Sequence, residues 1–187
     1  ALTTDAVVAL NSDQFQALTT RQVAALTTAQ VVAIETDDFA VIETNDLRAL
    51  TTAQMRALSS DQLAALNSDQ MAALTTAQVA ALNTAQVAAL NSDDLNALTT
   101  QQFAALTTDQ VANLTTDQVS TLETADLAAF NTAQIRALTT DGIVALNSDQ
   151  FQALTTRQVA ALSTAQVAAI ETDDFAAIET NDLRALT

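Results

Sequence analysis

The residues whose types could bind a metal ion or catalyse a reaction are carboxylates in two acidic segments. The segments lie 136 residues apart and share one set of side chains: Glu35, Asp37, Asp38, Glu43, Asn45 and Asp46 in the first, and Glu171, Asp173, Asp174, Glu179, Asn181 and Asp182 in the second. Oxygen ligands clustered in this way could hold Ca²⁺, which takes six to eight of them in proteins. Adjacent carboxylates such as Asp37 and Asp38 could also serve as a general acid and base.

A solvated acidic face is the simpler interpretation of both segments. Their spacing matches no known calcium-binding loop, and neither contains a Gly for a sharp turn. Each Glu in them is followed three residues later by an Asp, where most of the chain has Gln. That pairing indicates a changed helix start as readily as a set of ligands. We therefore predict no metal ligand, no cofactor and no catalytic residue.

Hydroxyl groups form a second candidate set, because Thr-Thr, Asn-Ser and similar pairs recur every eight residues. A regular Thr array can present a surface to ice or to sugars. The alternative is that the first side chain of each pair caps a helix, while the second bonds locally or to a neighbouring coil. The chain has no His to activate a hydroxyl as a nucleophile, so we do not expect an enzyme.

The composition excludes further classes of function. The 187 residues contain no Cys, His, Lys, Trp, Tyr or Pro, and 22 acidic residues against 6 Arg give a net charge of −16. Binding to a phosphate backbone needs clustered Lys and Arg, so we expect no nucleic-acid partner. The longest apolar run, residues 6–10, is too short to span a membrane, and no signal-peptide pattern opens the chain. We therefore expect no membrane insertion.

An eight-residue repeat organises the whole chain. Leu or Ile, or in one case Phe130, occupies every eighth position from Leu2 to Leu186. With this residue counted as position zero, the octad reads Leu-Thr-Thr-x-Gln-Val-x-Ala, and 23 complete octads follow one another without a linker. The pattern predicts a single repeat array over residues 1–187.

The octad predicts one short helix that ends within each repeat. A continuous helix would rotate its apolar stripe by about 80° per octad, which excludes a long coiled coil. The apolar spacings of five and three do not fit a strand either. Thr19 and Gln22 have the spacing of a capping box, while Leu18 and Val23 have that of a hydrophobic staple. The acidic residues all lie at or near this helix start, where the helix dipole favours negative charge.

Helices this short are unstable alone, so neighbouring coils must supply the core. We predict an all-α fold, a tightly wound α-solenoid with one helix of about six residues per octad. The scarcity of Gly predicts connectors without left-handed residues. Near-constant Ala at position seven predicts close helix packing. The pairs Phe15/Phe39 and Phe151/Phe175, each three octads apart, hint at three octads per turn.

A longer period lies over the octads. Residues 1–51 match residues 137–187 at 46 of 51 positions, so a block of seventeen octads is itself repeated. The chain starts and stops within a block and lacks an initiator Met, which predicts a piece of a longer tandem array. We also expect the uncapped ends of such an array to permit end-to-end self-association.

Two resemblances bear on function. Residues 26–34, Leu-Thr-Thr-Ala-Gln-Val-Val-Ala-Ile, resemble the helix start of a transcription activator-like effector repeat. The longer period and the base-reading pair of that family are absent, so we interpret the likeness as shared capping chemistry. Over all 187 residues the octad resembles the Ala-Leu-Thr-Thr-Ala-Gln-Val-Ala arrays of very large bacterial exported proteins, described as adhesin-like or haem-utilisation proteins.

The second resemblance implies an extracellular or cell-surface location in bacteria. No haem role is expected, because the chain has no His, Tyr or Cys as an axial ligand. We therefore expect a non-catalytic structural region of a large surface or secreted protein that acts as a spacer, stalk or adhesive surface. The sequence identifies no particular partner; contacts with a surface, a matrix or other proteins would run through the solenoid. The alternative is a ligand-binding solenoid that recognises ice, a glycan or Ca²⁺ through the Thr array or the acidic face.

Overall fold

The computed structural model describes residues 3–184 and 186, and all regular structure in them is helical. Twenty-three helices of four to six residues, one per octad, occupy these residues, and no strand is found among them. The prediction of an all-α solenoid with one short helix per octad is confirmed. Contacts divide the chain into two compact units, Ala1–Leu98 (unit 1) and Thr99–Thr187 (unit 2), which are described separately.

The helices of unit 1 are α1 (Thr4–Val8), α2 (Ser12–Gln16), α3 (Thr20–Ala24), α4 (Thr28–Val32), α5 (Thr36–Ala40), α6 (Thr44–Ala49), α7 (Thr52–Ala57), α8 (Ser60–Ala64), α9 (Ser68–Ala73), α10 (Thr76–Ala81), α11 (Thr84–Ala88) and α12 (Ser92–Asn96). Those of unit 2 are α13 (Thr100–Ala105), α14 (Thr108–Ala112), α15 (Thr116–Thr121), α16 (Thr124–Ala129), α17 (Thr132–Ala137), α18 (Thr140–Val144), α19 (Ser148–Ala153), α20 (Thr156–Ala161), α21 (Thr164–Ala169), α22 (Thr172–Ala177) and α23 (Thr180–Leu183).

Each helix begins at the residue after the cap that the octad predicts. In α8 the Ser59 side chain accepts a hydrogen bond from the Gln62 backbone N–H at 3.1 Å, and Gln62 Oε1 accepts one from the Ser59 N–H at 3.0 Å. The same reciprocal box is present in every described helix whose third residue is Gln. The Glu caps of α5, α6, α16, α22 and α23 make no side-chain cap bond. The helix start is therefore changed where Glu and Asp replace the usual cap residue and Gln, since Glu is a poor cap.

The helices end without a left-handed residue, since no described residue has a positive φ. At the end of α7 the connector residue Leu58 is already extended, with φ −56° and ψ 143°. Its backbone N–H still donates to the Met55 carbonyl at 3.3 Å, which tightens the last turn. The chain therefore leaves the helices through right-handed or extended residues that need no Gly, as the composition predicts.

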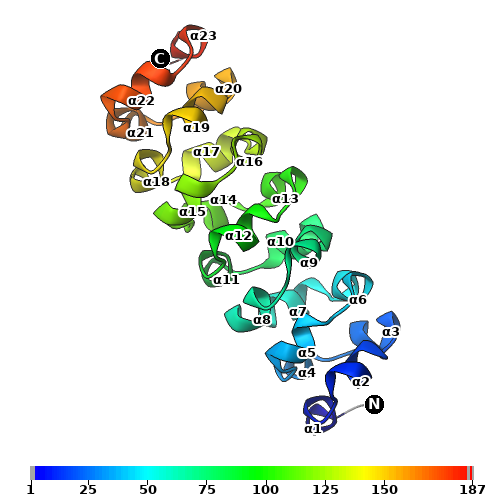
Figure 1. Ribbon diagram of the computed structural model, residues 1–187. Coiled ribbons are helices and arrows are strands. Elements are labelled where there is room, and N and C mark those ends of the chain that lie inside the picture. Colours follow the sequence, from blue (N-terminus) through cyan, green and yellow to red (C-terminus); the bar gives the residue numbers. More distant parts are fainter. Residues whose placement is uncertain (1–2, 185, 187) are drawn as a thin grey trace. The chain divides into compact units, whose positions relative to one another are not determined.

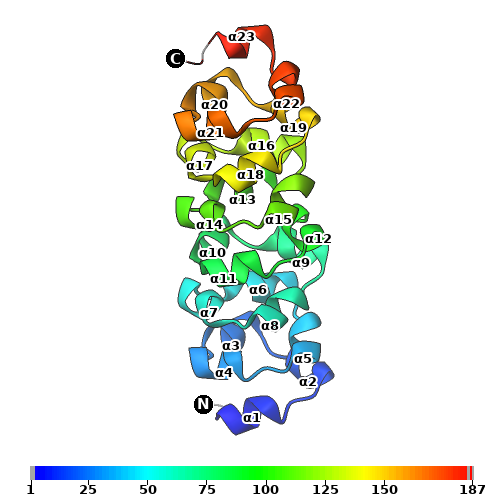
Figure 2. The same cartoon turned by 90° about the vertical axis from the view of Figure 1, so that its left-hand side faces the viewer.

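Within each unit, helices that are three octads apart pack on each other. In unit 1 this pairing runs from α1 with α4 to α9 with α12, and in unit 2 from α13 with α16 to α20 with α23. Figures 1 and 2 show one such stack in each unit, α4, α7 and α10 in the first and α13, α16, α19 and α22 in the second. Three octads therefore complete one turn of coil, which confirms the hint from the spaced Phe residues.

The core consists of the large apolar residue inside each helix and the residue at position zero. Met55 and Met71 are completely buried, as the octad predicts. In unit 2 the rings of Phe103 and Phe130 lie 6.1 Å apart at an angle of 57°. The hydrophobic stripe of each octad therefore faces inward although no single helix is longer than six residues.

Position seven does not behave as predicted throughout. Asn113 and Thr121 occupy it as exposed residues, and both bond to their own helix. Asn113 Nδ2 donates to the Asp109 carbonyl at 2.8 Å, and Thr121 Oγ1 donates to the Asp117 carbonyl at 2.9 Å. These two positions border solvent, which leaves room for side chains larger than Ala.

Candidate functional site

The structure separates the carboxylates of the acidic segments. In the first segment Glu35, Asp37 and Glu43 are exposed, whereas Asp38 and Asp46 are buried. The second segment follows the same pattern, with Glu171, Asp173 and Glu179 exposed. Asp174 is half-buried and Asp182 is buried. The Asn181 side chain lies outside the described residues. No described group of three or more acidic residues is arranged to hold a metal ion.

Three inward-facing Asp residues, Asp38, Asp174 and Asp182, bind hydroxyls of the preceding coil. Asp38 Oδ1 in α5 accepts a hydrogen bond from Ser12 Oγ in α2 at 2.6 Å. The repeated block contains the same bond, from Ser148 Oγ in α19 to Asp174 Oδ1 in α22, at 2.7 Å. Asp182 accepts from Thr156 Oγ1 in the same way. These Asp residues therefore link one coil to the next, and position two of the octad supplies their hydroxyl donors.

Asp126 occupies the equivalent position in α16 and is only 4% exposed. Burial, together with the smaller effect of the Glu123 carboxylate three residues earlier, raises the pKa of Asp126 from 3.8 to about 6. An acid with a raised pKa holds its proton more tightly in the folded chain than in the unfolded chain. The folded state is therefore destabilised as pH rises from about 4 to about 6, and the penalty is complete above pH 6.

We expect Asp126→Asn to raise the free energy of unfolding at pH 7 by about 1–2 kcal/mol, because it removes the buried charge. Solvent screening keeps this gain below the free energy that corresponds to the full pKa shift. At pH 4 the wild-type carboxyl is protonated, so the two chains should have equal stability. Urea denaturation at both pH values, followed by circular dichroism, measures the difference. The control is Asp109→Asn in the same unit, an exposed Asp that should change stability by less than about 0.5 kcal/mol. Equal gains from both variants would contradict the assignment to burial.

The hydroxyls at position one are committed to helix capping. Thr107 Oγ1 accepts from the Gln110 backbone N–H at 3.2 Å, and Thr51 Oγ1 accepts from the Gln54 N–H at 3.3 Å. The Thr and Asn residues at this position therefore act at helix starts, as the second of the two interpretations predicts.

The Gln residue of the octad has a second contact that the sequence reasoning missed. Gln62 Nε2 donates to the carbonyls of Val31 at 2.9 Å and Ile34 at 2.8 Å, at the end of α4 four helices earlier. Gln158 Nε2 in unit 2 donates likewise to Leu127 and Phe130, both at 2.8 Å. Carbonyls at a helix end have no partner within that helix, so each Gln closes the start of its own helix and the end of another.

This contact recurs through both units. The Nε2 atoms of seven further Gln residues donate to carbonyls 28 to 31 residues earlier: Gln54, Gln70, Gln78, Gln86, Gln134, Gln150 and Gln166. One feature of the sequence indicates this second contact of Gln. Glu serves a capping box as well as Gln does, yet Glu never occupies this position, because only an amide can also donate.

No helix among the described residues has the length and apolar character to cross a membrane. The sequence matches the family model described as the ALTTAQ repeat over residues 1–28, 39–76, 71–100, 87–124, 119–156 and 151–177. These segments include most of the chain. A comparison with curated proteins gives no match.

Proposed function

Because the chain belongs to the ALTTAQ repeat family, we propose that this structural repeat region acts as a non-catalytic spacer or stalk in a bacterial surface or secreted protein. Adding three octads adds one coil on the same contacts, so length can change without a new fold. The surface of the coils would then serve for contacts with a matrix or with other proteins.

The proposal rests on one observation: the polar side chains of the octad make hydrogen bonds within the fold. The position-one hydroxyls cap helices, the Gln amides join coils, and inward Asp residues bind hydroxyls of the preceding coil. Positions three and six, of which position three is exposed and position six exposed or half-buried, vary from octad to octad between Ala, Asp, Arg, Gln and other residues. A surface that recognises one repeated ligand would need a recurring set of free polar groups at these positions.

The surface location is supported by the resemblance of the octad to the arrays of very large exported bacterial proteins. The net charge of −16 supports the absence of a nucleic-acid partner. The lack of His and Cys, together with the dispersal of the carboxylates, supports the absence of catalysis. An adhesive role would use the variable exposed positions rather than a single site.

Two deletions of equal length test the spacer against the ligand-binding alternative. Residues 34–57 contain the first acidic segment, whereas residues 58–81 contain neither acidic segment, and each span is three whole octads. A spacer predicts that both deletions shorten the reach of the protein on the cell surface equally. It also predicts that 1 mM Ca²⁺ leaves the melting temperature of all three chains unchanged. A calcium-dependent rise in melting temperature that becomes smaller only in the chain without residues 34–57 would reject the proposal in favour of a cation site, since the second acidic segment remains in all three chains.

A further inference from the structure

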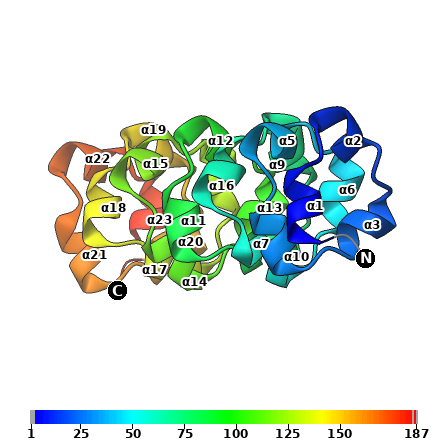
Figure 3. The same cartoon turned by 90° about the horizontal axis from the view of Figure 1, so that it is seen from below.

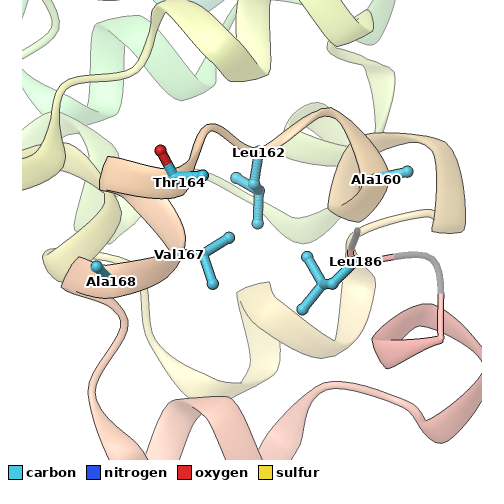
Figure 4. A pocket seen from close by; sticks show the side chains of 6 residues that line it. All are labelled: Ala160, Leu162, Thr164, Val167, Ala168 and Leu186. Atoms are coloured by element: carbon cyan, nitrogen blue, oxygen red, sulfur yellow. The ribbon is translucent and has the colours of Figure 1, made fainter.

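A cavity of about 320 Å³ lies between α20 and α21 in unit 2. Leu162, Val167 and Leu186 converge on it (Figure 4), and Thr164 alone among its lining residues has a polar side chain. A binding site for a small molecule combines an apolar pocket with several polar groups that fix the orientation of the ligand. One hydroxyl does not fix an orientation, so this cavity identifies no ligand.

A tripeptide at the end of α14 has a more specific chemistry. Asn113, Leu114 and Thr115 form the pattern Asn-x-Ser/Thr, in which the Asn side chain is the acceptor of an N-linked sugar. None of the other nine Asn residues of the chain is followed by Ser or Thr at this spacing. Asn113 also stands at position seven of its octad, where Ala is the usual residue. The pattern therefore arises from a departure from the octad and not from the octad itself.

The structure exposes the acceptor side chain on the surface of unit 2. Asn113 is the C-cap residue of α14 and begins the connector to α15, and both helices are labelled in Figure 3. Its Nδ2 donates a hydrogen bond to the Asp109 carbonyl at 2.8 Å. An amide nitrogen carries two hydrogens, so this bond engages only one of them. The nitrogen that would receive a sugar thus lies at the surface, at the start of a connector.

The connector after α14 lacks a contact that the preceding connector has. Gln134 Nε2 donates to the carbonyls of Phe103 and Leu106, at the end of α13, at 2.9 and 2.8 Å. The corresponding position for α14, 28 residues after Leu114, is Gly142, which has no side chain to donate. The connector after α14 can therefore open without breaking an amide contact to another coil. Local opening of this kind gives an enzyme access to a segment of a folded chain.

We propose that Asn113 is the acceptor of an N-linked sugar, which a glycosyltransferase transfers from a nucleoside diphosphate sugar. A bond forms between Nδ2 and C1 of the sugar, while the bond from C1 to the phosphate oxygen breaks and the nucleoside diphosphate leaves with the electron pair. One Nδ2 proton passes to a base of the transferase. The remaining Nδ2 hydrogen keeps the bond to the Asp109 carbonyl, and the sugar extends into solvent.

Incubation of the purified full chain with UDP-glucose and a soluble N-glycosyltransferase that recognises Asn-x-Ser/Thr tests the proposal. Mass spectrometry should show the addition of one hexose, and fragmentation should place it on Asn113. Thr115→Asn removes the pattern but keeps a capping residue before α15, since Asn also caps α11 and α17. This variant should accept no hexose. Thr115→Ser keeps both the pattern and the cap, and it should accept one hexose as the wild-type chain does.

Ala105→Asn tests the role of the connector within the same molecule. It adds the same tripeptide pattern at the end of α13, where position 105 is half-buried and the connector is bonded to Gln134. The added site should take up hexose at least about fivefold more slowly than Asn113, because a hydrogen-bonded connector opens less often.

A wild-type chain that accepts no hexose would overturn the proposal, as would a hexose retained in Thr115→Asn or equal rates at the two sites of the Ala105→Asn chain. These results are independent of the spacer function, which the two deletions test. Failure of one proposal is therefore distinguishable from failure of the other.

Discussion

Replacing Gln158 by Glu should lower the free energy of unfolding by about 2–4 kcal/mol, whereas the same change at Gln22 should alter it by less than about 0.5 kcal/mol. The nonapeptides around the two residues, 18–26 and 154–162, are identical. Both Gln side chains accept a hydrogen bond from the cap residue's N–H at 2.8 Å, so Glu preserves the capping box in both. Helix propensity and local sequence therefore cancel in the comparison.

The difference lies in the second contact. Gln158 is 2% exposed, and its Nε2 donates to the carbonyls of Leu127 and Phe130. A Glu there would place a carboxylate against two carbonyl oxygens and leave both without their donor. Gln22 is exposed on the N-terminal face of unit 1, where its carboxylate replacement would be hydrated.

Urea denaturation at pH 7, followed by circular dichroism, gives the two changes in stability. Because a repeat array can unfold in parts, amide hydrogen exchange within the affected unit provides an independent measure. Gln158→Ala serves as a further variant, since it removes the contact without adding charge and should cost less than Glu. Equal losses at the two sites would show that the Gln acts only within its capping box.

Truncation of the core should show the same dependence on a covering coil. Phe39→Ala should cost about 3–5 kcal/mol, because Phe39 is completely buried between α5 and its neighbours and leaves a cavity that the coil cannot fill. Phe175→Ala removes the same side chain from the same local sequence, Glu-Thr-Asp-Asp-Phe-Ala. Phe175 is half-buried, so its loss should cost less than half as much.

The midpoints of urea denaturation for the two Phe variants, each compared with the wild-type chain, measure this difference. Phe39→Leu is the matched control, because it retains most of the apolar volume and should cost about 1 kcal/mol. A Phe175→Ala loss as large as that of Phe39→Ala would mean that the exposed end of unit 2 is as well packed as the interior of unit 1.

Much of the local structure could be predicted from the octad. The Thr19–Gln22 spacing fixes the cap and the first turn, and the staple residues on either side fix the start of the helix. The two apolar positions mark the core, as the complete burial of Met55 and Met71 shows. The scarcity of Gly also correctly predicted connectors without left-handed residues.

The structure places the acidic residues of the candidate sites differently from the prediction. The acidic segments predict one solvated face, yet Asp37 is exposed and Asp38 is buried against Ser12 of another coil. Adjacent residues near a helix start point in different directions, so their common charge did not bring them together. The sequence also could not distinguish Asp38, which has a hydroxyl donor, from Asp126, whose pKa is raised to about 6 by burial.

The sequence alone determined where each helix starts, which side chains are apolar and how the pattern repeats, because capping and hydrophobic patterning act within one octad. Only the tertiary structure decided that three octads make a turn, since that number depends on the direction in which the connector residues, such as the extended Leu58, send the chain. The second role of Gln follows from the same geometry. Its amide finds carbonyls 28 and 31 residues away only after the coil has closed, so no local pattern encodes the contact.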